Sequence, residues 1–306
     1  MAWLRANSIE GEEMTVIDQL QGKLGLSRTQ LLRRLTQLGF GLFVVISSLR
    51  HNLVTSEHLA SIDAYCPFGG FATLYRWLTS GGLYVQKTHG SNLVLALGLI
   101  VGVILAGGAF CGWICPFGAL QDLLDWVRKV LRLPELKVPA RLDRILTYGR
   151  YLALAGILYA TISTVKLWFA DYDPYRTIFS LGWLFEFNLA EHWPAYVVAL
   201  VILAGSLLIR RFWCRYLCPL GGLISILGNF SLLRIRRSAD NCKGCAVCNA
   251  PCPVKIDVAR AKSAVSADCI GCLECVEACP RPGSLEVTLG PALPPILRRE
   301  RKERVA

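Results

Sequence analysis

Eight cysteines near the carboxyl end constrain the fold of this 306-residue chain more than any other feature. They form two runs of one pattern, Cys-x-x-Cys-x-x-Cys-x-x-x-Cys-Pro. The first run is Cys242, Cys245, Cys248 and Cys252, and the second is Cys269, Cys272, Cys275 and Cys279. A tight loop of three thiolates binds three corners of an iron–sulfur cubane, and the fourth thiolate of each run reaches the other cluster. The pattern therefore predicts two [4Fe–4S] clusters.

This is the ligand pattern of bacterial two-cluster ferredoxins, and it assigns every ligand. Cluster one takes Cys242, Cys245, Cys248 and Cys279, and cluster two takes Cys269, Cys272, Cys275 and Cys252. Gly244 and Gly271 keep the two loops slim and leave backbone amides free to donate to cluster sulfurs. Zinc ribbons and disulfides do not account for eight cysteines in this double register. We expect a small α+β ferredoxin domain over residues 238–289 that relays single electrons.

The rest of the chain is more apolar than a soluble domain. Hydrophobic residues make up 54% of the sequence and charged residues 18%. Four apolar stretches are candidates to cross a bilayer: residues 35–54, 93–110, 151–165 and 193–209. The first contains Arg50 and His51 near its end. The sequence thus predicts an all-α membrane bundle of four transmembrane helices joined to the ferredoxin domain.

Lysine and arginine are distributed unevenly around these stretches, and the formal net charge is +11. Basic residues gather before the first stretch, between the second and third, and after the fourth. The other two loops are nearly bare of them: Arg76 and Lys87 lie in one and Arg176 in the other, with Lys166 directly after the third stretch. By the positive-inside rule, both termini lie in the cytoplasm and the protein lies in the bacterial inner membrane. Basic clusters beside apolar spans indicate membrane topology, so we expect no nucleic-acid partner.

The membrane part contains an internal repeat. Three pairs of residues are each 103 positions apart: His89 and His192, Cys111 and Cys214, and Cys115 and Cys218. The predicted units cover about 35–131 and 148–233 within a membrane domain over 35–233. Both run in the same direction, which predicts a pseudo-two-fold axis along the membrane normal. A cytoplasmic segment over 1–34 precedes this domain, and a basic tail over 290–306 follows the ferredoxin domain.

Each repeat ends in Cys-x-x-x-Cys-Pro, and three interpretations of these four cysteines stay open. They form one redox or metal site, or two separate redox-active pairs, or they are structural. A spacing of four places both sulfurs of a pair on one face if the helix persists. Cys115 and Cys218 are expected at helix N-termini, where the helix dipole lowers a thiol pKa. Cys66 stands outside these pairs, before Pro67, as a turn former or part of a redox or partner site.

The repeated histidines are the candidates for proton chemistry. His89 and His192 occupy equivalent positions at the ends of the second and fourth stretches. A histidine at a membrane edge is commonly an interfacial polar residue. Equivalent placement in two repeats favours a role as proton acceptor for a quinol or as a metal ligand.

Four spans, paired Cys-x-x-x-Cys-Pro motifs and a double-cubane domain together resemble the NapH/MauN membrane ferredoxin family. The core is also similar to the carboxyl-terminal half of NosR-type proteins and to CcoG-type proteins, and the likeness covers roughly residues 30–290. The resemblance implies quinol oxidation at the bilayer. It also implies transfer of electrons to an iron–sulfur or cytochrome partner.

We therefore expect a quinol dehydrogenase-type subunit that passes electrons between the quinone pool and a redox partner. One alternative is a reductase or assembly factor for a copper centre that uses the membrane-edge cysteine pairs. A second alternative is an anchor or redox sensor without catalytic activity.

Overall fold

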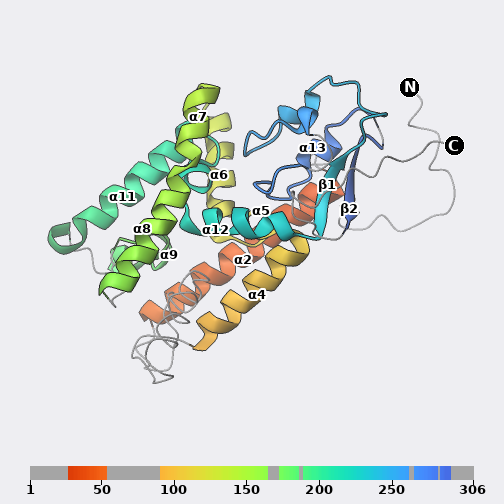
Figure 1. Ribbon diagram of the computed structural model, residues 1–306. Coiled ribbons are helices and arrows are strands. Elements are labelled where there is room, and N and C mark those ends of the chain that lie inside the picture. Colours follow the sequence, from red (N-terminus) through yellow and green to blue (C-terminus); the bar gives the residue numbers. More distant parts are fainter. Residues whose placement is uncertain are drawn as a thin grey trace, which may run out of the picture.

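The computed structural model of the chain describes residues 27–53, 90–164, 172–185, 189–261, 265–281 and 283–290. Helices dominate these ranges, and two short strands pair near the carboxyl end. A helical body carries a small carboxyl-terminal module at one end (Figure 1). Cys66 and His89 lie outside the described residues.

Four longer helices occupy the four predicted apolar stretches. They are α2 (Arg28–Leu53), α4 (Gly90–Ala106), α8 (Gly149–Thr164) and α11 (Leu189–Leu208). In the described ranges, α2 alone combines the length and apolarity that crossing a membrane requires. The residues Val94–Ala106 and His192–Leu208 form shorter apolar helices. The helical positions agree with the sequence, and the number of membrane crossings stays a prediction.

The long helix α2 turns its polar residues inward and its leucines outward. Arg33 is fully buried, and Gln30 and Gln37 are nearly so. On the other face, Leu38 is 68% exposed and Leu42 is 61% exposed. This arrangement is the reverse of a helix packed in a water-soluble core, where apolar residues turn inward.

The same inversion occurs in α6 (Pro116–Val130). The sequence shows an apolar stripe along this helix that ends at Leu131. In the structure, Leu123 and Leu131 on this stripe are exposed, whereas the side chains of Asp122 and Asp125 are buried. Buried ion pairs with arginine explain this orientation, because a buried carboxylate needs a charged partner. A short helix, α7 (Ala140–Thr147), follows and buries none of its residues.

The remaining helical segments are short and lie around the long helices. They are α5 (Ala109–Trp113), α9 (Pro174–Phe179), α10 (Gly182–Phe185), the π-helical η3 (Trp213–Leu217), α12 (Pro219–Leu227) and the 3-10 turn η4 (Gly228–Phe230). Aromatic side chains fill the centre of the body, where Phe117 stacks on Trp213 with ring centroids 5.5 Å apart.

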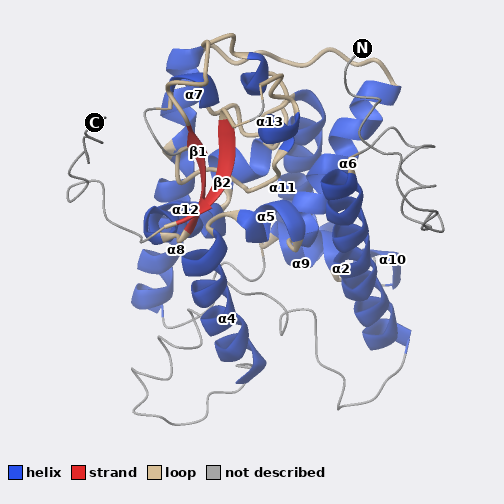
Figure 2. Ribbon diagram, turned by 90° about the vertical axis from the view of Figure 1, so that its right-hand side faces the viewer, coloured by secondary structure: helices blue, strands red, loops and turns tan. Residues whose placement is uncertain are grey.

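The carboxyl-terminal module is built on an antiparallel pair, β1 (Leu233–Arg237) with β2 (Leu285–Leu289) (Figure 2). Two 3-10 turns, η5 (Val247–Asn249) and η6 (Val258–Arg260), and the short helix α13 (Glu274–Glu277) complete it. Its core packs Ile235, Val258, Val265 and Leu285 around buried cysteines. This is an α+β module, and β1 begins just before the predicted domain start at residue 238.

Candidate metal centres

The first cysteine set surrounds one hollow in the module. Cys242, Cys245 and Cys248 line it from one loop, and Cys279 joins them from the other run. The loop conformation depends on Gly244, whose φ is +70°, and on Ala246, whose φ is +57°. These left-handed residues turn the chain so that three thiols face one centre. The structure thus gathers the four residues assigned to cluster one.

The second set repeats this loop. Gly271 and Leu273 have φ values of +60° and +62°, matching the corresponding residues of the first loop. Cys275 lies close enough to Cys269, Cys272 and Cys252 for their charges to interact. Burial raises the pKa of Cys272 to about 12, so this thiol is protonated at neutral pH unless a metal displaces the proton. The donor set and loop shape fit a [4Fe–4S] cluster, which binds four thiolates.

The two sets differ in their surroundings. Cys245 of the first set is exposed, whereas Cys252, Cys272 and Cys275 of the second set are buried. The first set faces solvent on the outer side of the module. The second set lies toward the helical body.

The second cysteine loop is docked on α5 through backbone contacts. A Cβ atom placed on Gly108 would lie 2.5 Å from the carbonyl oxygen of Cys269, and one on Gly112 would lie 2.2 Å from that of Ile270. No side chain fits at either position. The indole Nε1 of Trp113 also donates to the Gly271 carbonyl at 2.9 Å. The bundle and the module therefore form one continuous body at this loop.

A buried ion-pair network stabilises the same junction. Arg33 donates to Asp122 on α6 and to Glu274 on α13, both at 2.6 Å. Arg211 reaches the other oxygen of Asp122 at 2.7 Å. Burial alone would raise the pKa of Asp122, but Arg211 and Arg33 outweigh burial and hold the pKa at about 2. Arg33 of α2 thus links Asp122 of α6 to Glu274 of the module.

The second repeat contacts the module in a comparable way. Arg150 of α8 pairs with Asp268 at 2.6 Å, and Ser225 donates to the same oxygen. Asp268 directly precedes the second cysteine loop and Glu274 lies inside it. Both repeats therefore fix this loop with an arginine. Arg33, Asp122 and Arg150 were not predicted from the sequence as site residues. Polar residues at positions 30, 33 and 37 share one face of α2, and this pattern indicates a buried polar contact there.

The four bundle cysteines adopt the same local structure in both repeats. The amide of Cys115 donates to the carbonyl of Phe110, and that of Cys218 donates to the carbonyl of Trp213, each at 2.9 Å. These bonds span five residues, so each segment is a π-type turn, which is frequent at functional sites. Cys115 and Cys218 then cap α6 and α12 with matching extended conformations.

One expectation for these cysteines was confirmed and one was wrong. Cys115 and Cys218 lie at helix N-termini, because the proline that follows each of them starts a new helix. The thiol pKa at these positions is nevertheless raised, not lowered. Burial raises the pKa of both Cys115 and Cys218, outweighing the backbone amides that lower it.

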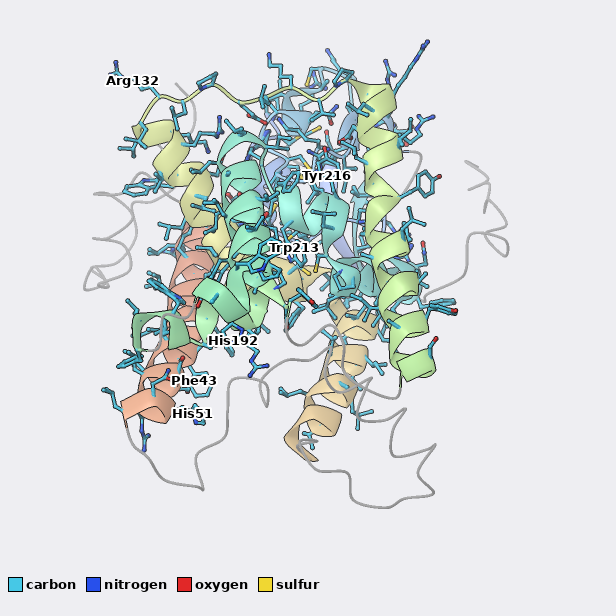
Figure 3. All side chains as sticks on the ribbon, turned by 90° about the vertical axis from the view of Figure 1, so that its left-hand side faces the viewer. Phe43, His51, Arg132, His192, Trp213 and Tyr216 are labelled. Carbon is cyan, nitrogen blue, oxygen red and sulfur yellow. The ribbon has the colours of Figure 1, made fainter. Side chains whose placement is uncertain are left out.

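The four bundle thiols nevertheless converge. Cys111 lies close enough to Cys115, Cys214 and Cys218 for their charges to interact. Sulfur atoms are visible in the interior beside Trp213 (Figure 3). In the described part of the chain, no three His, Cys, Asp or Glu side chains are placed to hold one metal ion. All twelve described cysteines are free of disulfides.

The repeated histidine that the structure describes lies elsewhere. His192 is exposed on α11, toward the end of the helical body away from the module, as is His51 (Figure 3). It is not part of the cysteine sets.

Comparisons with known proteins agree with this picture. A family model described as a 4Fe-4S binding domain matches residues 88–134 and again 191–238. A second, described as a 4Fe-4S dicluster domain, matches residues 234–280. MauN of Methylorubrum extorquens, a methylamine utilization ferredoxin-type protein, is 31% identical over 76% of this chain and 78% of its own length. No solved structure matches the chain.

Two other relatives match this chain over a smaller part of their own length. YccM of Escherichia coli is 31% identical, over 74% of this chain and 64% of its own length. The ferredoxin-type protein NapH of Haemophilus influenzae is 28% identical, over 58% of this chain and 61% of its own length. Thiol loops of this geometry together with these matches define an iron–sulfur electron-transfer protein. Within that class, the chain belongs to the NapH/MauN-type family of ferredoxin-type proteins.

Proposed function

We propose that the protein is a membrane-bound, quinol dehydrogenase-type subunit that passes electrons between the quinone pool and a redox protein through two [4Fe–4S] clusters. One observation carries the proposal. The second cysteine loop lies backbone to backbone against a helical body that exposes many large apolar side chains. A redox module and a lipid-compatible surface are therefore parts of one body.

The outward leucines of α2 support the membrane part of the proposal. Water disfavours such a surface at about 25 cal/mol per Å² of apolar area, whereas lipid tails do not. The buried arginine and glutamines suit a bilayer as well, because polar groups there turn toward the bundle interior. We infer four crossings by α2, α4, α8 and α11, with both termini in the cytoplasm.

The helix α7 supports a position at the membrane–water interface for the side of the body that carries the module. On α7, Leu142 and Ile145 are exposed, and each directly follows an arginine, Arg141 or Arg144. Apolar residues mixed with basic ones suit the boundary between lipid tails and anionic headgroups.

The module contains two sets of four cysteines, and each set supports the binding of one cluster. When bound, each cluster accepts and donates one electron. Oxidation of one quinol to quinone releases two electrons and two protons. The chain would bind the quinol, take its protons at His89 and His192, and hold the clusters that take the electrons one at a time. The electrons then leave to an iron–sulfur or cytochrome partner.

A direct test mixes the purified protein, in lipid nanodiscs and without oxygen, with a reduced quinol. Cluster reduction is followed by visible absorbance and EPR. We expect reduction by the quinol, and a slower rate in a protein carrying both His89→Ala and His192→Ala. His51→Ala is the matched control, since His51 lies near the same end but has no repeat counterpart among the candidates.

Two outcomes would count against the proposal. Clusters that dithionite reduces but no quinol does would exclude the quinol role. Reoxidation of reduced clusters by Cu(II), with no response to quinol, would favour the copper reductase instead.

A further inference from the structure

We propose that Cys111, Cys115, Cys214 and Cys218 hold a third [4Fe–4S] cluster, shared between the two repeats. This goes beyond the two-cluster relay proposed above. It also stands separately, because its test counts iron and does not depend on quinol. The argument starts from ligand number: each repeat matches a 4Fe-4S binding domain but carries only two cysteines. A cubane held by cysteines needs four, so only the two repeats together can supply a complete set.

The two half-sites have matching backbone geometry. A Cβ on Gly118 would lie 2.3 Å from the carbonyl oxygen of Cys111, and one on Gly221 would lie 3.1 Å from that of Cys214. In each repeat a glycine lets the new helix return closely over the first cysteine of the pair. The four thiols are thus presented by two equivalent turns, as a site on a pseudo-two-fold axis requires.

Backbone amides at the two helix starts are aimed at the sulfurs. The Gly221 amide donates to the Cys218 sulfur at 3.3 Å. The amides of Gly118 and Phe117 lie near the Cys115 sulfur, although the Cys115 side chain makes no capping hydrogen bond. Hydrogen bonds of this kind stabilise thiolates and are one of the means by which proteins set cluster potentials.

A buried cation also faces the site. Arg211 donates to the Cys111 carbonyl at 3.0 Å and lies close enough to Cys214 for their charges to interact. Four thiolates around a cubane carry excess negative charge, which a buried site must compensate. Arg211 supplies that charge, while Asp122 holds its guanidinium in place from the other side.

The number and kind of the donors fit a cubane. Each of its four irons takes one cysteine thiolate, so four thiols from two repeats complete the set.

The location of the four bundle cysteines suits a role in electron transfer. Cys111 adjoins Gly112, which lies directly against the loop of the second cysteine set. A cluster between the repeats would extend the one-electron relay from the ferredoxin module into the helical body. It would shorten the path between a quinol in the bilayer and the module.

The test measures iron and acid-labile sulfide per chain in protein reconstituted without oxygen. We expect about twelve irons in the parent protein and about eight in a Cys111→Ser, Cys214→Ser double variant. Cys66→Ala is the matched control and keeps about twelve, because Cys66 belongs to none of the three sets.

A second measurement does not depend on folding of the variant. Mössbauer spectra of the ⁵⁷Fe-loaded parent protein should show iron in three cubanes, and the four bundle cysteines should resist alkylation until the protein is denatured. About eight irons in the parent protein, with the four bundle thiols alkylated under native conditions or occupied by copper, would overturn the proposal.

Discussion

The helical body and the carboxyl-terminal module differ in the polar content of their interiors. The body buries Arg33, Asp122 and Arg211 beside apolar clusters and exposes many leucines, whereas the module buries Val258 and Leu285 around its thiols. Buried ion pairs therefore add to apolar packing in the body, whereas apolar packing around the thiols dominates the module. Substitutions in the two regions should therefore change stability by different amounts, and the largest expected effect comes first.

The largest effect is expected from Arg33→Leu. This change leaves Asp122 and Glu274 without their shared cation, and breaking a buried pair costs about 3–5 kcal/mol. Arg34→Leu is the control, because Arg34 is 41% exposed at the side chain and stands 3.6 Å from Asp122. Thermal unfolding in detergent measures both. Equal losses from the two variants would show that the body does not depend on buried charge.

The second effect is a pH dependence that arises from Asp122. Its folded-state pKa of about 2 lies below the ordinary value of 3.8, so its contribution is present above the ordinary pKa and is lost as pH falls toward 2. The contribution is on the order of 2–3 kcal/mol. Asp122→Asn should therefore be less stable than the parent by a constant amount above about pH 5. The difference should shrink below about pH 4, and a difference that grows on acidification would contradict the assignment.

In the module, Val258→Ala should cost roughly 2 kcal/mol, because it removes two methyl groups from a packed core. Arg260→Ala, at an exposed ion pair with Asp257, should change stability by less than about 0.5 kcal/mol. Chemical unfolding followed by loss of the cluster absorbance measures both variants. If the surface pair proved as costly as the core valine, the contrast between the two interiors would fail.

A further loss is expected from Gly112→Ala at the junction of the two regions. The new methyl group would meet the Ile270 carbonyl, and overpacking typically costs about 1–3 kcal/mol. Gly98→Ala is the control, since nothing lies within 4 Å of its Cβ position and helix propensity should improve by about 1 kcal/mol. Limited proteolysis at the module would report undocking. Similar cleavage of both variants would mean that the backbone contact does not hold the regions together.

The sequence predicts the module better than the body, for a physical reason. Three ligands of each predicted cluster lie within one short loop, so their spacing alone encodes the site. The helix positions were also readable, because apolar stretches of sufficient length admit few other structures. The junction was not readable: Gln30 donates to the Cys272 carbonyl across 242 residues, and no local pattern encodes that contact.

At the bundle cysteines, the sequence predicts the local structure but not the contacts between the two repeats. The four-residue spacing places both sulfurs of a pair on one face only if the helix persists. The prolines after Cys115 and Cys218 instead start new helices, which agrees with the expected place of these two cysteines at helix N-termini. The repeat was visible in the sequence at an offset of 103. Its consequence, that two distant pairs of thiols face one another, required the fold.

The contact between Gln30 and Cys272 joins residues that the ribosome adds far apart in time. Docking of α2 on the second cysteine loop therefore waits until residue 272 has been made.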